Sequence, residues 1–284
     1  MYLTESFNEI EEPIEKRDDK DVRKRLKRLI SPFILRRTKE EVLTELPPKT
    51  EVDLVVDMSM DEKVLYEALR QRAVENIENS SDDGDHRFKV LAEITKLRQA
   101  SCHPMLIDKK STIQSSKLSL FTEKITEIIG TKHQALVFSQ FVGHLKIIAA
   151  NLDTLGIPYF YLDGSTPAKK RGLLVEQFQN GERPIFLISL KAGGSGLNLT
   201  AADYVFHMDP WWNPAVEDQA SDRVHRIGQE RPVTIYRLIT GGTIEEKIIS
   251  MHKNKRNLAE SLLDDGGSSL KIDTKELINI ISGK

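Results

Sequence analysis

The chain contains 284 residues, of which 39% are hydrophobic and 30% are charged. That length and balance are enough for one large or two modest folded domains, and they exclude a mini-protein and a disordered chain. With a formal net charge of -2, the whole chain has no general attraction for nucleic acid, so a polyanion site requires a local basic patch.

Cys102 is the single cysteine of the chain, which excludes an intramolecular disulfide and a multi-cysteine metal site. We therefore expect a reducing, intracellular setting, either the cytoplasm and nucleoid of a prokaryote or the nucleus of a eukaryote. No stretch approaches the roughly 20 apolar residues that span a bilayer. Residues 1–20 are acidic and lack an apolar core, so we do not expect a signal peptide.

The first clear pattern lies at residues 22–30. Val22, Leu26, Leu29 and Ile30 recur at helical spacing among basic residues, which predicts an amphipathic basic helix. Such a helix could brace DNA or a neighbouring domain, although a solvated charged face is the favoured interpretation of a charge run.

The rest of the first half is predicted to be mainly helical, with one strand. An alternating stretch from Glu51 to Asp57 predicts the strand. Apolar residues at helical spacing over 64–69 and 88–100 predict two helices, separated by a polar loop from Asn79 to Asp85. A second polar connector at 111–116 ends this part of the chain.

The second half alternates short apolar runs with amphipathic segments. The runs suit buried strands and the segments between them are long enough for crossover helices, so we expect an α/β fold whose parallel sheet is covered by helices on both faces. The predicted strands are 135–138, 159–162, 185–188, 204–208 and 234–239.

Two of the helices between these strands have recognisable starts. Thr166–Pro167 and Asn213–Pro214 each offer a capping side chain followed by a proline at the first helical position. We expect the second of these helices to end near Gly228, because glycine commonly follows a helix.

The connectors suggest three parts. Residues 1–115 are predicted to form a linker and a helical insertion, residues 116–265 the sheet domain, and residues 266–284 a tail helix after a glycine- and serine-rich joint.

In an open parallel sheet, ligands bind in the loops beyond the carboxyl ends of the strands. The candidate loops are therefore 139–140, 163–166, 189–198 and 209–213.

Several catalytic motifs are absent from the sequence. It contains no G-x-x-x-x-G-K-[ST], so it is not a complete P-loop ATPase. The loop at 190–199 has Leu199 where a dinucleotide fingerprint needs glycine, and Leu197 where a nucleophile elbow needs glycine. The seven histidines lack zinc-ligand spacing, so we expect no metal site.

The most informative segment is QASDRVHRIGQ, residues 219–229. If the preceding helix continues through it, Arg223 and Arg226 share one face with Gln219. Two neighbouring guanidinium groups suit phosphate oxygens, because their planar forks donate in pairs. The alternative is an exposed helix in which Asp222 pairs with Arg226, and on the arginines alone this alternative is favoured.

Four segments of the second half stand in a characteristic order: ALVFSQF (135–141), YLDGST (161–166), the block 188–229, and VTIYRLIT (233–240). Together they resemble the second RecA-like lobe of Swi/Snf-type DNA-translocating ATPases of helicase superfamily two. Residues 32–52 and 115–125 resemble the linker and helical elaboration of the same family. The resemblance implies a RecA-like sheet domain with a mainly helical N-terminal insertion subdomain.

The resemblance also implies a nucleotide site. ATP and magnesium would be held mainly by a first lobe, whose phosphate-binding and acidic motifs are missing from this chain. Arg223 and Arg226 match the arginine-finger positions of the family, and Gln219 matches the glutamine of the same motif.

Gly193, Gly194 and Gly196 match a glycine-rich motif of the family and would let the backbone approach the nucleotide or DNA. The alternative is a tight turn between a strand and a helix.

The family also has DNA-facing positions, and hydroxyl, amide and backbone groups there suit phosphate contacts. Capping of helices is an alternative role for the two serines. The matching residues are Ser139, Gln140, Gly164, Ser165, Lys191 and Lys117.

We therefore expect the second motor lobe of an ATPase stimulated by double-stranded DNA, a translocase or remodeller that is inactive without its first lobe. Its expected partners are duplex DNA, the first lobe and a DNA-bound target protein. The alternative is a stand-alone nucleic-acid-binding or adaptor module that retains the fold without ATPase activity.

Overall fold

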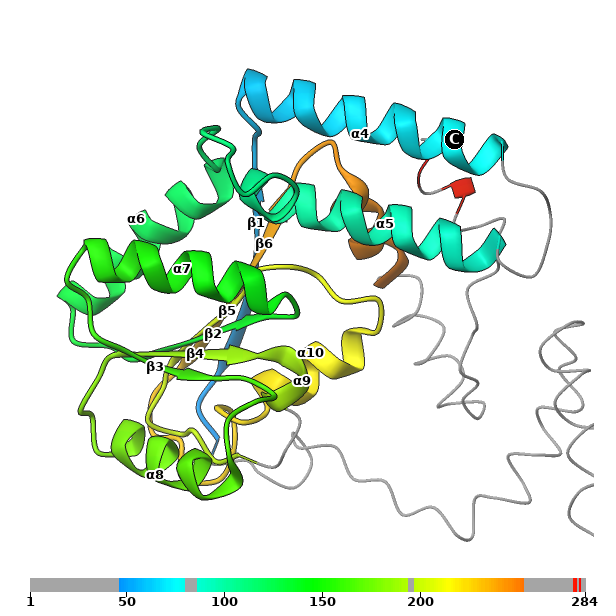
Figure 1. Cartoon of the computed structure of the whole chain (residues 1–284). Coiled ribbons are helices and arrows are strands. Elements are labelled where there is room, and N and C mark those ends of the chain that lie inside the picture. Colours follow the sequence, from blue (N-terminus) through cyan, green and yellow to red (C-terminus); the bar gives the residue numbers. More distant parts are fainter. Residues whose placement is uncertain (1–45, 80–85, 194–196, 253–277, 280, 282–284) are drawn as a thin grey trace, which may run out of the picture. The chain divides into compact units, whose positions relative to one another are not determined.

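The structure, a computed structural model, describes residues 46–79, 86–193, 197–252, 278–279 and 281 (Figure 1). The chain divides into two compact units, Met1–Thr44 with Ser250–Asp273, and Glu45–Ile249 with Thr274–Lys284. The basic helix predicted at 22–30 and the joint at 266–269 lie outside the described residues, and the boundaries predicted at 115 and 265 stay predictions.

The second unit is built on a six-stranded sheet, in which the order is β1-β6-β5-β2-β4-β3 and every neighbouring pair is parallel. This confirms the predicted α/β class and each predicted strand, including the one from the linker, which pairs with β6. The strands are β1 (Lys49–Val56), β2 (Ala135–Ser139), β3 (Tyr159–Leu162), β4 (Ile185–Ser189), β5 (Tyr204–His207) and β6 (Val233–Thr240).

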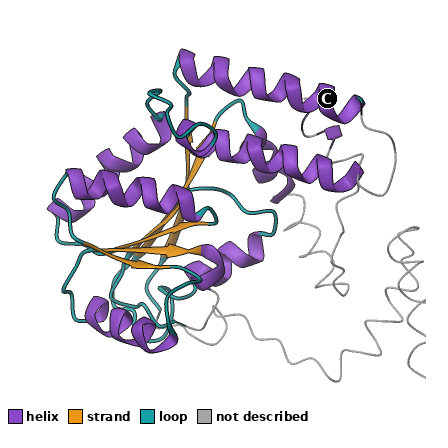
Figure 2. Cartoon of the chain, in the orientation of Figure 1, coloured by secondary structure: helices purple, strands orange, loops and turns teal. Residues whose placement is uncertain are grey.

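Helices cover both faces of this sheet (Figure 2). Alternate residues of β2 point to opposite sides, because side chains along a strand alternate. Leu136 and Phe138 pack into a cluster with Phe178 of α8, whereas Val137 packs with Phe121 of α6 and with α7. Among the helices of this unit are α4 (Met60–Glu78), α5 (His86–Cys102), the short 3-10 helix η2 (Pro104–Leu106), α6 (Ser116–Gly130), α7 (Val142–Thr154), α8 (Ala168–Gln179), α9 (Leu190–Gly193) and α10 (Pro214–Ser221).

One of the two predicted helix starts is correct. Asn213 caps α10, since its side chain accepts a hydrogen bond from Ala215 N at 3.1 Å, and Pro214 is the first helical residue. The start predicted for α8 is wrong by one position, because Pro167 itself is the residue before the helix. The Thr166 hydroxyl instead accepts a hydrogen bond from the backbone of Asp163.

The helices α4 and α5 lie side by side (Figure 1). Both are hydrogen-bonded to the segment at the carboxyl end of β6. The Tyr66 hydroxyl of α4 accepts a hydrogen bond from Ile244 N at 2.8 Å. The Thr240 hydroxyl donates to Ser101 O of α5 at 2.7 Å. These buried bonds fix the helical pair above the edge of the sheet where ligands of parallel sheets bind.

A buried ion pair joins three elements at that edge. Lys117 of α6 donates to both carboxylate oxygens of Glu245, at 2.8 and 2.6 Å, and to Met208 O beyond β5, at 3.1 Å. The Glu245 carboxylate also accepts a hydrogen bond from Thr240 N at the end of β6. Both side chains are almost fully buried, at 1% and 0% exposure, so each charge depends on the other.

We expect Lys117→Met to lower the free energy of unfolding by about 3–5 kcal/mol, because the buried Glu245 carboxylate loses its counter-charge. Urea unfolding of the chain, followed by far-UV circular dichroism, measures the effect. Lys124→Met is the matched control on the same helix, because Lys124 pairs with the exposed Glu127. A loss at position 117 no larger than at position 124 would contradict the assigned role.

Candidate functional site

The loops that the sequence singled out converge at the carboxyl edge of the sheet. Ser139 ends β2 at the centre of the sheet, and Asp163 follows β3 at its border. Lys191 lies in α9 directly after β4, and Asp209 follows β5. The parallel arrangement places all of them at one edge, as expected for a binding edge of an open sheet.

Asp209 connects the ends of β5 and β2. Its carboxylate accepts hydrogen bonds from the Ser139 hydroxyl and from Gln140 N, the latter at 3.1 Å. Burial raises the pKa of Asp209 to about 6, although the nearby Arg98 guanidinium and the Ser139 hydroxyl act in the opposite direction. Ser139 is 2% exposed and engaged with Asp209, whereas Gln140 is half-buried. The Gln140 side chain is thus the better placed of the two for a ligand.

Arg98 of α5 approaches the same loop from the helical pair. Its Nη2 donates to Pro210 O at 2.6 Å and lies 3.9 Å from an oxygen of Asp209. The guanidinium carbon is 5.3 Å from the ring centroid of Trp211 and 5.6 Å from that of Trp212. The sequence does not reveal this residue, because a single arginine inside a helical pattern carries no signal of a contact 112 residues away.

The loop after β3 presents an exposed polar turn. Ser165 donates to Asp163 from its backbone nitrogen at 2.9 Å and from its hydroxyl at 2.6 Å. These bonds, the serine hydroxyl first, hold the pKa of Asp163 below its usual range. Gly164 and Ser165 are exposed, and the first turn of α8 beyond them carries the exposed Lys169 and Lys170 with no side-chain cap.

The glycine-rich segment after β4 is described only in part. Lys191 is exposed, whereas Gly193 is buried. A Cβ atom at position 193 would lie 2.9 Å from Cε1 of Phe138, so close packing against this ring requires glycine there. Gly194 and Gly196 lie outside the described residues, and their predicted role stays a prediction.

The predicted helix through the arginines is wrong. Helix α10 ends at Ser221, well before Gly228. The backbone nitrogens of Arg223 and Val224 bond three residues back, at 3.2 and 3.0 Å, which marks a tighter turn than an α-helix. The Arg223 carbonyl instead accepts a hydrogen bond from Leu199 N at 3.0 Å, so it is not available to a further helical turn.

Gln219, Arg223 and Arg226 therefore do not share a helical face. Gln219 is exposed on α10, Arg223 is half-buried in the turn, and Arg226 is exposed. The alternative, in which Asp222 pairs with Arg226 one turn along a helix, also required the helix to continue past Ser221. The bend is completed by Gly228, whose φ of 98° is a conformation that favours glycine.

A buried acid on α10 was also missed. Glu217 is 0% exposed and accepts hydrogen bonds from Trp211 N at 2.7 Å and from Arg237 Nε of β6 at 2.9 Å. Arg237 further pairs with Asp53 of β1 at 2.7 Å. This network fixes α10 to the sheet, and an acid at a buried helix position has no signature in the sequence that separates it from an exposed one.

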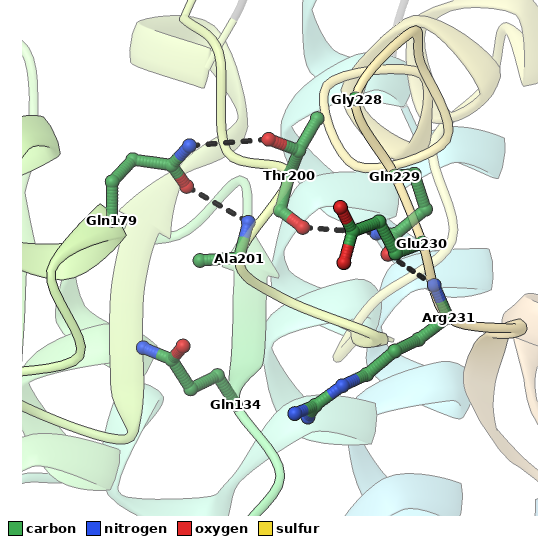
Figure 3. Close-up of a pocket in the computed structure, with 8 residues that line it drawn as sticks. All are labelled: Gln134, Gln179, Thr200, Ala201, Gly228, Gln229, Glu230 and Arg231. Atoms are coloured by element: carbon green, nitrogen blue, oxygen red, sulfur yellow. Dashed lines mark hydrogen bonds between the residues drawn. The ribbon is translucent and has the colours of Figure 1, made fainter.

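A pocket of about 330 Å³ lies between the segment that contains Thr200 and Ala201 and the segment 228–231, which follows the arginines (Figure 3). The Gln229 side-chain amide donates to Thr200 O and Ala202 O, at 3.1 and 2.7 Å, and its oxygen accepts from Arg231 N. Gln179 bonds Thr200 Oγ1 and Ala201 N. These side-chain amides hold the two segments together, and the hydrogen bonds that they form are made to other groups of the protein.

Cys102, His144 and Asp209 place one potential metal ligand each within 4.8 Å of one another, and all three are buried. Their surroundings fit a metal ion poorly, because both Asp209 oxygens accept hydrogen bonds from the protein. Burial, and then the nearby Lys117 ammonium, hold the pKa of His144 well below its usual range. A metal ion bound there would be repelled by the same Lys117 ammonium.

Lys117 is buried and its ammonium is used by Glu245 and Met208 O, so it is not available for the predicted DNA contact. Among the described residues, no helix has the length and apolar character that a bilayer crossing requires.

Two protein families match the chain. The SNF2-related domain matches residues 4–106, and the Helicase conserved C-terminal domain matches residues 117–228. The chain is also similar to the Bacillus subtilis protein YwqA, whose name assigns it to ATP-dependent helicases or translocases. The two are 40% identical over 274 residues, which cover 93% of this chain and 30% of YwqA. The chain spans 24–30% of the length of this and two further curated relatives.

Solved structures are also similar to this chain. The Sulfolobus solfataricus SWI2/SNF2 ATPase C-terminal domain superposes with a TM-score of 0.66 at 29% identity, covering 82% of this chain and 97% of that one. The core of the Sulfolobus solfataricus ATPase in complex with double-stranded DNA gives a TM-score of 0.67 at 34% identity. That match covers 95% of this chain but 57% of the core. The RecA-like expectation is thereby confirmed.

The stability of the fold should depend on pH through His207, at the end of β5. Its ring is buried, lies 2.8 Å from the Ser221 hydroxyl, and burial lowers its pKa to about 4. Because the unfolded chain binds this proton near pH 6.5, the stability contributed by the neutral ring is present above that pH. It declines as the pH falls toward 4, by on the order of 3 kcal/mol at most.

We therefore expect His207→Gln to flatten the decline in unfolding free energy between pH 6.5 and pH 4, measured by urea unfolding at several pH values. Asp209 has a raised pKa and acts with the opposite sign, so the difference between the chain and its variant isolates His207. His86→Gln, which removes a partly exposed histidine, is the control. An unchanged slope for His207→Gln would contradict the assignment.

Proposed function

We propose, from the premise that this chain belongs to the SWI2/SNF2 family of ATPases, that it is the second motor lobe of an enzyme that moves along double-stranded DNA. The enzyme hydrolyses ATP in a cleft between this lobe and a first lobe. Opening and closing of the cleft convert nucleotide turnover into alternating grip on the duplex.

One observation carries the half-motor proposal. The chain covers 97% of a solved SWI2/SNF2 C-terminal domain but 57% of a complete SWI2/SNF2 core. We attribute the part left uncovered to the remaining lobe of that core. In agreement with this division, the sequence contains no phosphate-binding P-loop. ATP and its magnesium ion are therefore bound mainly by the first lobe.

The contribution of this chain to the reaction is positive charge. Arg226 is exposed and lies in the turn after α10, and Arg223 precedes it, tied through its carbonyl to the segment after the glycine-rich loop. A guanidinium group that reaches the γ-phosphate stabilises the charge that develops as the bond breaks, and such a group is worth about 10³–10⁵ in rate. Gln219 is exposed on α10 and takes part in the same cleft.

The DNA contacts are proposed at the exposed polar groups of the carboxyl edge. Gln140, the turn at Gly164 and Ser165, and Lys191 present amide, hydroxyl and ammonium donors there. Such groups contact phosphates in any sequence, as a translocating motor requires. The start of α8, which no side chain of its N-cap residue caps, adds the backbone N–H groups of its first turn. Ser139 acts indirectly, by holding Asp209.

We expect the isolated 284-residue chain to show no ATP hydrolysis above background with or without duplex DNA, because the triphosphate has no P-loop to bind. A coupled assay of phosphate release measures this, with the full-length protein, meaning this chain joined to its first lobe, as the positive control. Turnover by a contaminant-free preparation of the isolated chain would contradict the half-motor assignment, and salt-sensitive DNA binding without any turnover in the full-length protein would favour the adaptor alternative.

In the full-length protein, Arg226→Ala should reduce the DNA-stimulated rate by about 10³-fold or more while DNA binding remains within a few-fold. Arg226→Lys should restore little, since an ammonium lacks the planar fork. Arg231→Ala is the control, because Arg231 is exposed five residues farther on and bonds Asp203. If Arg226→Ala turned over ATP as fast as Arg231→Ala, Arg226 would not be the finger.

A further inference from the structure

The guanidinium group of Arg98 is buried in an aromatic and polar niche on the loop between β5 and α10, residues 208–213. Arg98 is 3% exposed, and its guanidinium carbon also lies 5.4 Å from the ring centroid of Phe141. Together with the two tryptophans and Pro210 O, this ring surrounds a single charge. Its Nε makes no hydrogen bond among the described residues, so the cation–π contacts and the Nη2 hydrogen bond hold the group.

This niche suits arginine and not lysine. A planar guanidinium group can stack on rings and donate a hydrogen bond in its own plane at the same time, whereas an ammonium group cannot. A buried charge is costly without a partner, and the Asp209 carboxylate at 3.9 Å supplies the opposite charge. If the loop moved away, Arg98 would lose both its hydrogen bond to Pro210 O and the nearby Asp209 carboxylate. The contact therefore favours one loop conformation.

The loop that Arg98 holds has two further attachments, one on each side. At one side, Asp209 accepts hydrogen bonds from Ser139 and from Gln140 N, at the end of β2. At the other, Trp211 N donates to Glu217 of α10 at 2.7 Å. The loop therefore connects the proposed DNA contact at Gln140 to the helix that precedes the arginines.

We propose that Arg98 is a positioning residue that couples DNA contact at Gln140 to ATP turnover by holding the loop at 208–213 in one conformation. This inference rests on the proposed function. It assigns to the helical pair α4–α5 a part in the motor, because α5 supplies the residue that fixes the loop. Arg98 itself touches neither the nucleotide nor the DNA.

The first test is kinetic and uses the full-length protein. Arg98→Lys should lower the DNA-stimulated ATPase rate roughly five- to tenfold, within the usual range of coupling between two sites. Gln140→Ala should also lower it, and the double variant should be less than about twofold slower than Arg98→Lys alone, because both act through one loop. Independent, multiplicative effects would overturn the proposal.

The control is Arg87→Lys, the same substitution at an exposed position of the same helix α5, which should leave the stimulated rate unchanged. If Arg98→Lys behaves like Arg87→Lys, the proposal is wrong. If Arg98→Lys fails to fold, Trp212→Leu replaces it, since Trp212 is half-buried and forms one wall of the niche. Trp212→Leu should reduce the stimulated rate in the same direction, and no change would overturn the proposal.

A second readout does not depend on activity. Trp211 and Trp212 are the two tryptophans of this chain, and the Arg98 guanidinium carbon lies 5.3 and 5.6 Å from their ring centroids. Arg98→Lys should shift their emission to longer wavelength and increase quenching by acrylamide, relative to Arg87→Lys. If the wild-type protein lacks DNA-stimulated turnover, the proposed function fails, whereas unchanged tryptophan emission in Arg98→Lys refutes the positioning role alone.

Discussion

The buried pair of Lys117 and Glu245 is the constraint on which the carboxyl edge of the sheet depends. Its two charges draw together the start of α6, the end of β5 through Met208 O, and the end of β6 through Thr240 N. A buried charge that loses its partner is strongly destabilising, so these three elements cannot separate independently. The loops above the edge inherit their spacing from this arrangement, and so does the helical pair that attaches at Thr240.

The exposed and buried polar residues of the site have different tasks. Gln140, Ser165, Lys191 and Arg226 present side chains to the surroundings. A second group is buried and fixes the backbone: Ser139, Asp209, Arg98, Glu217 and Arg237 bond one another or the adjacent loops. This division follows from physical chemistry, because a ligand contact has to be reachable while a buried polar group has to be satisfied by the protein.

Local patterns predicted the sheet well. Short apolar runs located five of the strands, since a strand covered on both faces is buried throughout, as β2 and β4 are, whereas an alternating pattern located β1. The capping of α10 by Asn213 was equally visible. The end of α10 was not, because the bond from Leu199 N to the Arg223 carbonyl comes from a distant loop. Lys117, Arg98 and Glu217 were misjudged or missed for a related reason: burial of a charged side chain is set by tertiary contacts that the sequence does not display.

The bond between Leu199 and Arg223, together with the Gln229 amide that spans Thr200 and Ala202, joins the 197–202 segment firmly to the arginine turn. An evolutionary or engineered change in the length of either segment would therefore be transmitted to the other. Grafting the arginine turn onto a related scaffold should require carrying the 197–202 segment with it, because the turn borrows its shape from that neighbour.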